Sequence, residues 1–135
     1  MTTFLSRYTD LIYAMFRFML GALFAFHGLQ KMSGYPGPGG PVPLMSLGGL
    51  AGVIELVTGT MIAVGFFGAW AGFLSSGTMA VAYFIGHASG GFLPIVNKGE
   101  PAVMYCFSFL LIAAMGSGRY SIDALLLGGR RRAPV

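Results

Sequence analysis

Long uncharged stretches are the feature that most limits what this chain can fold into. Between Leu47 and Ala88 the only ionisable side chains are Glu55, Tyr83 and His87. A transmembrane helix needs about 20 mostly apolar residues, so this stretch alone is long enough for two crossings. Only 9% of the 135 residues are charged, whereas soluble domains usually have about a quarter. The sequence therefore predicts an all-α integral membrane protein.

Four apolar segments divide the chain. They cover residues 11–29, 47–66, 69–88 and 101–115. A tight turn near Gly65 joins the second and third segments, and Pro101 suits the first turn of the fourth, where its missing N–H would be unpaired anyway. Ser121 can cap a short interfacial helix that runs through Leu127. We expect a single domain over residues 1–135, a four-transmembrane-helix bundle with a short interfacial C-terminal helix.

The distribution of basic residues predicts the orientation of these helices. Two loops, 32–46 and 89–100, are rich in glycine and proline, so the first of them should hold no regular element. Four crossings put both loops on one side of the membrane and both termini on the other. The loops carry Lys31 and Lys98, whereas the terminal side carries five arginines: Arg7, Arg119, Arg130, Arg131 and Arg132. The positive-inside rule therefore predicts cytoplasmic N- and C-termini.

The formal charge of +4 does not indicate a nucleic-acid-binding protein. Three arginines form a run over residues 130–132, and the other basic residues are scattered singly without a basic stripe. Such a terminal run is typical of a topology signal that also contacts anionic lipid. Cys106 is the only cysteine, which excludes a disulfide within the chain. We expect the lipid bilayer, and not nucleic acid, as a partner.

Arg17 and Glu55 are the two charged residues predicted to lie deep in the membrane. A charged side chain there costs roughly 2.5–3.5 kcal/mol on insertion scales, so it usually faces the bundle and has a partner. At about 1.5 Å per residue, Arg17 lies about 20 Å and Glu55 about 12 Å below the outer boundary. We therefore expect an ion pair or a short bridged network between them. Such a pair can act directly in function or only fix the helix register.

Other polar residues share faces with these charges. Helical periodicity aligns Lys31 with Arg17 on the first predicted helix, with His27 beside them, and aligns Tyr83 with His87 on the third. Histidines near helix ends can be hydrated, or can ligate haem or a metal. No Cys-x-x-Cys-His, His-x-x-x-His or Glu-x-x-His pattern accompanies them, so we assign no metal site. The candidate ligand-binding residues are Arg17, His27, Lys31, Glu55, Tyr83, His87 and Asn97.

Short motifs in a fixed order carry a family resemblance. They are residues 17–31 (RFMLGALFAFHGLQK), Glu55 with Gly59 and Gly65, His87, residues 92–100 (FLPIVNKGE) and residues 116–123 (GSGRYSID). In this order and spacing, from about residue 16 to 125, the chain resembles the DoxX family of bacterial membrane proteins.

The resemblance implies a location and a class of function. It implies four helices in the bacterial inner membrane with both ends in the cytoplasm. The family takes its name from a similarity to the membrane subunit of a thiosulfate:quinone oxidoreductase, and its members are associated with redox partners. The resemblance thus implies a quinone- or sulfur-linked component, with a site formed by matching residues: Arg17, His27, Lys31, Glu55, His87 and Asn97. One cysteine and no flavin or nucleotide motif favour an oxidoreductase subunit over a stand-alone enzyme.

Three functions follow as hypotheses. The first is a redox subunit that binds quinone or a small sulfur oxyanion near the outer leaflet, where His27 or His87 exchanges protons with a quinone oxygen. The second is a non-catalytic structural or assembly subunit of a larger membrane complex or of a homo-oligomer. The third is a small-solute channel or transporter, which would require oligomerisation because four short helices leave little room for a conduit.

Overall fold

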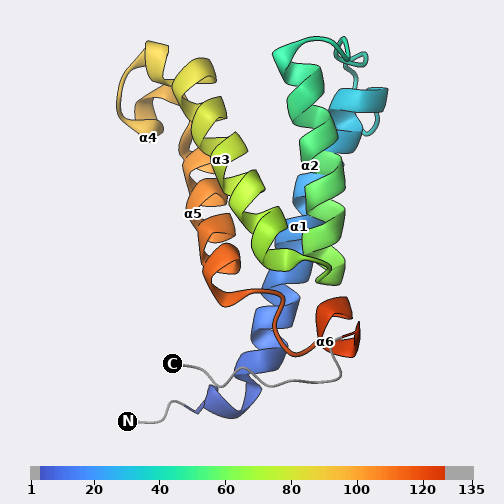
Figure 1. The fold of residues 1–135 in the computed structure, drawn as a ribbon. Helices are drawn as coiled ribbons and strands as arrows, with labels where there is room; N and C mark the ends of the chain where they lie inside the picture. The colour runs from blue at the N-terminus through green and yellow to red at the C-terminus, as the bar shows by residue number, and fades with distance from the viewer. Residues whose placement is uncertain (1–3, 127–135) are drawn as a thin grey trace.

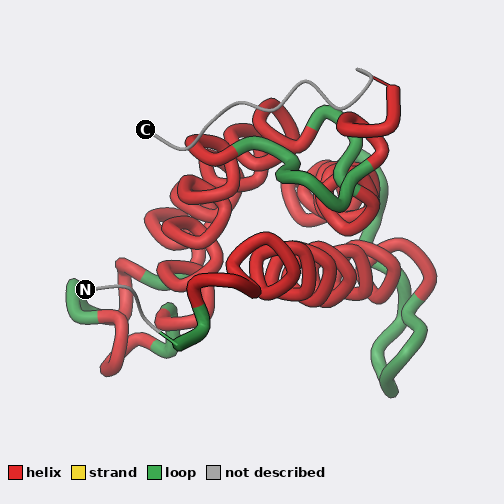
Figure 2. Tube along the Cα trace, turned by 90° about the horizontal axis from the view of Figure 1, so that it is seen from below, coloured by secondary structure: helices red, strands yellow, loops and turns green. Residues whose placement is uncertain are grey.

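A computed structural model describes residues 4–126, and within that range every regular element is helical (Figures 1 and 2). The elements are η1 (Ser6–Tyr8), α1 (Thr9–Ser33), α2 (Leu47–Val64), α3 (Gly68–Gly86), η2 (Ala88–Gly90), α4 (Pro94–Asn97), α5 (Glu100–Met115) and α6 (Ile122–Leu126). The predicted all-α class is confirmed.

A helix lies over each of the four predicted apolar ranges. α1 extends beyond its predicted range at both ends, and Pro101 lies in the first turn of α5 as predicted. The loop at 89–100 is more ordered than a simple connection, because it contains α4 and part of η2. Ser121 accepts a hydrogen bond from the backbone N–H of Ala124 at 3.1 Å, which supports the predicted cap of the short C-terminal helix. Its predicted end at Leu127, and the arginine run, lie outside the described residues.

Glycines bring α1 and α2 into close antiparallel contact. A Cβ atom added to Gly28 would lie 2.3 Å from the backbone nitrogen of Leu56, and one added to Gly21 would lie 2.4 Å from that of Ala63. Backbones can approach this closely only where side chains are absent, as small-residue faces allow in membrane helix pairs. The contact fixes which residues of the two helices are level with each other.

A second helix pair, α3 with α5, packs on the first through aromatic side chains. The Phe24 ring on α1 lies 4.5 Å from the Phe109 ring and 5.5 Å from the Tyr105 ring, measured between centroids. Phe24 and Phe109 are fully buried together with Ile62 and Ile112. Figure 1 shows the two pairs meeting near the α2–α3 turn and diverging toward the end that carries α4.

The outer surface of this arrangement is apolar. Large hydrophobic side chains are exposed along α1, α2, α3 and α5. Two helical stretches, Ser6–Ser33 and Leu47–Val64, have the length and the apolar composition needed to cross a membrane, and the apolar helix Glu100–Met115 is shorter. The α4 end and the Gly- and Pro-rich loop lie at one end of the molecule, and η1 and α6 at the other (Figure 1).

The glycine contact predicts a position-specific loss of stability. Gly28→Ala must push α1 away from α2, and overpacking of this kind typically costs about 1–3 kcal/mol. Gly77 is a matched control, because it lies inside α3 and an added Cβ would meet no atom within 4 Å. Thermal unfolding in detergent should therefore show a lower Tm for Gly28→Ala and an unchanged or higher Tm for Gly77→Ala. Equal shifts in the two variants would contradict the close contact.

Candidate functional site

The predicted site residues lie in three separate places. Arg17 is at the α2–α3 turn; Lys31, Glu55 and His27 are near the upper part of α1 and α2; Tyr83, His87 and Asn97 surround the α4 loop. The structure therefore brings together two subsets of the seven residues, and it does not form one site from all of them.

The predicted ion pair between Arg17 and Glu55 is wrong. The Arg17 guanidinium donates instead to the backbone carbonyls of Ile62, Ala63 (2.9 Å) and Tyr120 (2.8 Å). Because Gly28 lies against Leu56 and Gly21 against Ala63, Arg17 and Glu55 are separated by about 12 residues, or about 18 Å, along the helix axis. The prediction required the outer ends of α1 and α2 to be level, but in the structure the two helices are offset along their axes.

Arg17 acts as a cap for the C-terminus of α2. The last carbonyls of a helix have no partner within it and carry partial negative charge. A guanidinium satisfies two of them here and at the same time holds the Tyr120 carbonyl of the C-terminal segment. Gly65, at φ 71°, leaves room for this arrangement, since an added Cβ would lie 2.7 Å from Arg17 Nη1 and 2.4 Å from Ser121 Cβ.

Asp123 provides the corresponding cap at the N-terminus of α3, a role that the sequence reasoning missed. Its carboxylate accepts from the Ser117 hydroxyl at 2.5 Å and from the backbone N–H groups of Phe67 (3.0 Å) and Gly68 (3.3 Å). The Asp123 N–H donates to the Gly65 carbonyl at 3.0 Å. The segment 117–123 thus holds the α2–α3 turn in place through these hydrogen bonds. In the sequence, Asp123 stands two positions after Ser121, the predicted cap of the short C-terminal helix, and this position could have indicated the role.

The surroundings of Asp123 lower the pKa of its carboxyl group. Partial burial alone would raise this pKa, but hydrogen bonds from Ser117, Phe67 and Gly68 and the nearby positive charge of Arg17 outweigh that effect. The ionised carboxylate is therefore the form that the folded protein stabilises.

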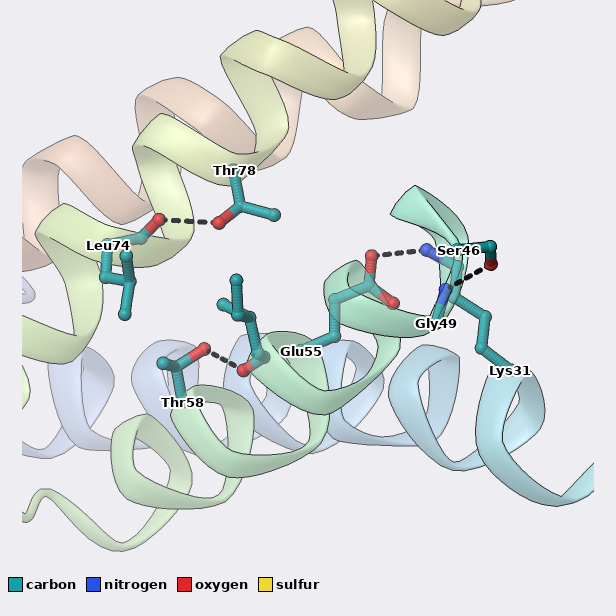
Figure 3. A network of polar contacts seen from close by, with 8 residues as sticks. Lys31, Ser46, Gly49, Glu55, Thr58, Leu74 and Thr78 are labelled. Atoms are coloured by element: carbon teal, nitrogen blue, oxygen red, sulfur yellow. Dashed lines mark hydrogen bonds and ion pairs between the residues drawn. The ribbon is translucent and has the colours of Figure 1, made fainter. Parts of the chain in front are cut away.

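Glu55 of α2 and Lys31 of α1 form an ion pair in the part of the molecule that is uppermost in Figure 1. The Lys31 Nζ lies 2.5 Å from Glu55 Oε1 (Figure 3). The Glu55 residue is 1% exposed, while the Lys31 side chain is 34% exposed. An added Cβ on Gly52 would lie 2.9 Å from Lys31 Cβ, so the lysine stem runs directly over this glycine. The pair therefore links α1 to α2 and extends from the interior to the surface.

The second oxygen of Glu55 has no such partner. Oε2 is buried and accepts no hydrogen bond from any residue in the range 4–126. A buried carboxylate normally has its oxygens hydrogen-bonded, because an unsatisfied charged group costs more than a typical neutral one. The site thus offers a strong hydrogen-bond acceptor that the described part of the chain leaves unused.

Polar and aromatic groups occupy the space between the helix pairs near Glu55. On the next turn of α2, Thr58 accepts a hydrogen bond from Ser75 of α3 at 2.7 Å. His27 is exposed one turn before Lys31, and its ring meets that of Tyr105 edge-on, with centroids 6.0 Å apart. This region therefore combines an acceptor, a cation and a histidine.

The Tyr83, His87 and Asn97 side chains organise the α4 loop. Asn97 Nδ2 donates to the Gly91 carbonyl at 2.6 Å and to the Tyr83 hydroxyl at 3.2 Å, and its Oδ1 accepts from the Gly99 N–H at 2.8 Å. His87 Nδ1 lies 3.1 Å from the Asn97 carbonyl. Most of the polar atoms of this cluster are thus engaged within the loop, which indicates a structural role.

The described part of the chain forms no metal site, and its apolar surface hollow lies away from Glu55. Within residues 4–126 no three His, Cys, Asp or Glu side chains are grouped closely enough to hold a metal ion. A shallow hollow on the outer face of α1 is apolar and separate from Glu55. It is lined by Ile12, Met15, Phe16, Met19, Leu20 and Leu23.

Comparison with known proteins identifies relatives of this chain. The family model described as DoxX matches residues 12–88. An uncharacterised protein from Haemophilus influenzae is 34% identical over 128 residues, which cover 88% of this chain and 93% of the relative. No solved structure matches the chain.

The Asp123 cap predicts a pH-dependent contribution to stability. Loss of a capping carboxylate in Asp123→Ala should lower stability at pH 7 by about 1 kcal/mol. Because the folded-state pKa is depressed, this contribution is present above about pH 4 and is lost as the pH falls through the folded-state pKa.

Thermal unfolding in detergent from pH 7 to pH 3 measures this effect. The difference in Tm between wild type and Asp123→Ala should shrink on acidification. The control is Asp10→Ala, because Asp10 makes an exposed contact with Arg119 at 3.6 Å, and exposed pairs contribute little. A constant difference over the whole pH range would contradict the capping role.

Proposed function

Because the chain belongs to the DoxX family of membrane proteins, we propose that it is the membrane subunit of a redox process and binds a quinol headgroup beside the Lys31–Glu55 pair. The observation that carries the proposal is the buried Oε2 atom of Glu55, which accepts no hydrogen bond within residues 4–126. A ligand that occupies this position must bring a hydrogen-bond donor. A quinol hydroxyl supplies one on a flat apolar ring, which suits an apolar interior that is reached from the lipid.

Charge favours a quinol over a sulfur oxyanion as the ligand. Lys31 and Glu55 together carry no net charge, and the unused atom belongs to the carboxylate. Two like unit charges 4 Å apart repel by about 4 kcal/mol at an effective dielectric constant near 20. An anion beside Oε2 is therefore disfavoured, whereas a neutral donor gains a charge-assisted hydrogen bond.

His27 is the better of the two candidate histidines for proton exchange with the quinol. It lies one helical turn from Lys31 and contacts the Tyr105 ring. His87, by contrast, is tied to the Asn97 carbonyl in the α4 loop. An imidazole ring can both donate and accept a proton, which suits proton exchange with a quinol oxygen. In this proposal the chain binds the quinol and His27 accepts the protons that the quinol releases on oxidation. A partner redox subunit accepts the electrons.

We also propose that α1, α2, α3 and α5 each cross the bacterial inner membrane, with both termini in the cytoplasm. α3 has 19 residues and α5 has 16, lengths of about 28 and 24 Å that approach the roughly 30 Å hydrocarbon core. Both helices expose large apolar side chains. The excess of arginine on the terminal side supports this orientation.

Glu55→Gln tests the quinol site directly. The substitution removes the charge of the acceptor, so the affinity for a short-chain quinol should fall about tenfold, in line with the 1.5–3 kcal/mol value of hydrogen bonds to charged groups. His27→Ala should reduce quinol-dependent electron transfer to the partner. Glu100→Gln is the control, because Glu100 is an exposed acid at the start of α5. Isothermal titration calorimetry in lipid nanodiscs measures the affinities.

Two results would contradict the quinol proposal. The first is equal quinol affinity in wild type and Glu55→Gln. The second is absence of quinol binding in wild type together with a stable oligomer, which would favour the structural or assembly subunit. Tighter binding of thiosulfate than of quinol would instead favour the sulfur oxyanion.

Cysteine labelling tests the four-crossing arrangement. With Cys106 replaced by alanine, cysteines are introduced at Gly39, where an added Cβ meets no atom within 4 Å, and at exposed Arg119. An impermeant maleimide should label Gly39→Cys in intact spheroplasts and Arg119→Cys only after permeabilisation. Labelling of both positions from the same side would contradict the three crossings, by α2, α3 and α5, that the proposal places between them.

A further inference from the structure

The α4 loop presents a cluster of large apolar side chains that the helix packing does not use. Phe92 is 78% exposed, Leu93 60%, Ile95 79% and Val96 66%. These four residues, which we call the α4 apolar surface, occupy five consecutive positions. Apolar clusters of this kind on a protein surface usually mark a contact with another molecule or with a membrane.

Several polar groups next to this surface are hydrogen-bonded inside the loop. The Tyr83 hydroxyl donates to the Phe92 carbonyl, and Asn97 Nδ2 donates to the Gly91 carbonyl at 2.6 Å. The Asn97 Oδ1 accepts from the Gly99 N–H at 2.8 Å. Backbone in contact with lipid must satisfy its polar groups internally, whereas a loop in water can hydrogen-bond to solvent. Hydrogen bonds within the loop thus satisfy part of its backbone, as suits the boundary between headgroups and acyl chains, where water still reaches the remaining polar groups.

The surface continues the apolar exterior of the neighbouring helices. Exposed Phe84 and Ile85 lie at the end of α3, and exposed Met104 lies near the start of α5. Figure 1 shows α4 beside the upper ends of these two helices. Exposed Lys98 and Glu100 directly follow the surface in the chain. Charged side chains at such a boundary can reach the headgroup region while apolar neighbours enter the acyl chains.

We propose that the α4 apolar surface inserts into the boundary between headgroups and acyl chains of the leaflet at the loop end. Its partner is thus the lipid itself, and the loop lies in the membrane surface and not above it. Continuity with the exposed apolar residues of α3 and α5 favours lipid over a second protein. The Tyr83–Asn97 hydrogen bonds then hold the loop in shape at this boundary. The inference does not depend on quinol binding.

Tryptophan fluorescence tests the insertion. Trp70 is the only tryptophan, so Phe92→Trp and Ile95→Trp are each made in a Trp70→Phe background. Gly39→Trp in the same background is the control, because Gly39 lies in the other loop at the same end with open space around it. The proteins are reconstituted in vesicles whose lipids carry bromine near the carbonyl end of the acyl chain. Circular dichroism confirms that each variant retains its helices.

The expected result is blue-shifted emission and a loss of fluorescence in brominated lipid for Phe92→Trp and Ile95→Trp, with little effect of aqueous acrylamide. Gly39→Trp should show the reverse. If acrylamide quenches all three alike, the loop lies in water and the inference is wrong. If neither quencher reaches positions 92 and 95, protein covers the surface, and the inference is equally wrong. Using two positions guards against misfolding of one variant.

Discussion

The glycine-mediated contact between α1 and α2 determines where every charged side chain of the interior lies. Gly21 and Gly28 allow the backbone of α1 to approach that of α2 near Ala63 and Leu56. Cβ atoms at these positions would overlap the opposing backbone, so the two helices cannot pack this closely in a shifted register. The register in turn places Arg17 at the end of α2 and Lys31 beside Glu55. The chemistry of the molecule thus depends on a contact that contains no polar side chain.

The two buried charges differ in the kind of partner they have, although Arg17 Nε and Glu55 Oε2 are each buried without a hydrogen-bond partner within residues 4–126. Arg17 binds three backbone carbonyls, and Asp123 binds two backbone N–H groups and a serine hydroxyl around the same turn. Arg17 thus caps the C-terminus of α2, which carries partial negative charge, and Asp123 caps the N-terminus of α3, which carries partial positive charge. Glu55 has Lys31 as a partner for one oxygen, and its other oxygen accepts no hydrogen bond within the described residues. Arg17 binds only backbone carbonyls at the ends of structural elements, as a cap does, whereas Glu55 pairs with a lysine side chain that is 34% exposed and so reaches the surface.

The proposed quinol site and the proposed lipid contact of α4 lie toward the same end of the molecule. There the two helix pairs diverge (Figure 1), and the Lys31–Glu55 pair extends from the interior to the surface. A lipid-soluble ligand approaches such a site from within the bilayer.

The sequence by itself determined the helical class, the positions of the helices and the apolar exterior. These features depend on local composition: runs free of charge, Pro101 at a helix start, and Ser121 before a short helix. It also identified Arg17 and Glu55 as the unusual buried charges, because charge in an apolar run is visible without a structure.

Tertiary structure alone decided which of these charges meet. Pairing depends on the relative height and rotation of two helices, and a one-dimensional pattern does not contain either quantity. The distance from Glu55 to Arg17 or to Lys31 follows from where Gly28 contacts Leu56, a fit between backbones that neither segment reveals alone. The Asp123 cap has the same origin, because its partners at Phe67 and Gly68 are more than 50 residues away in the chain.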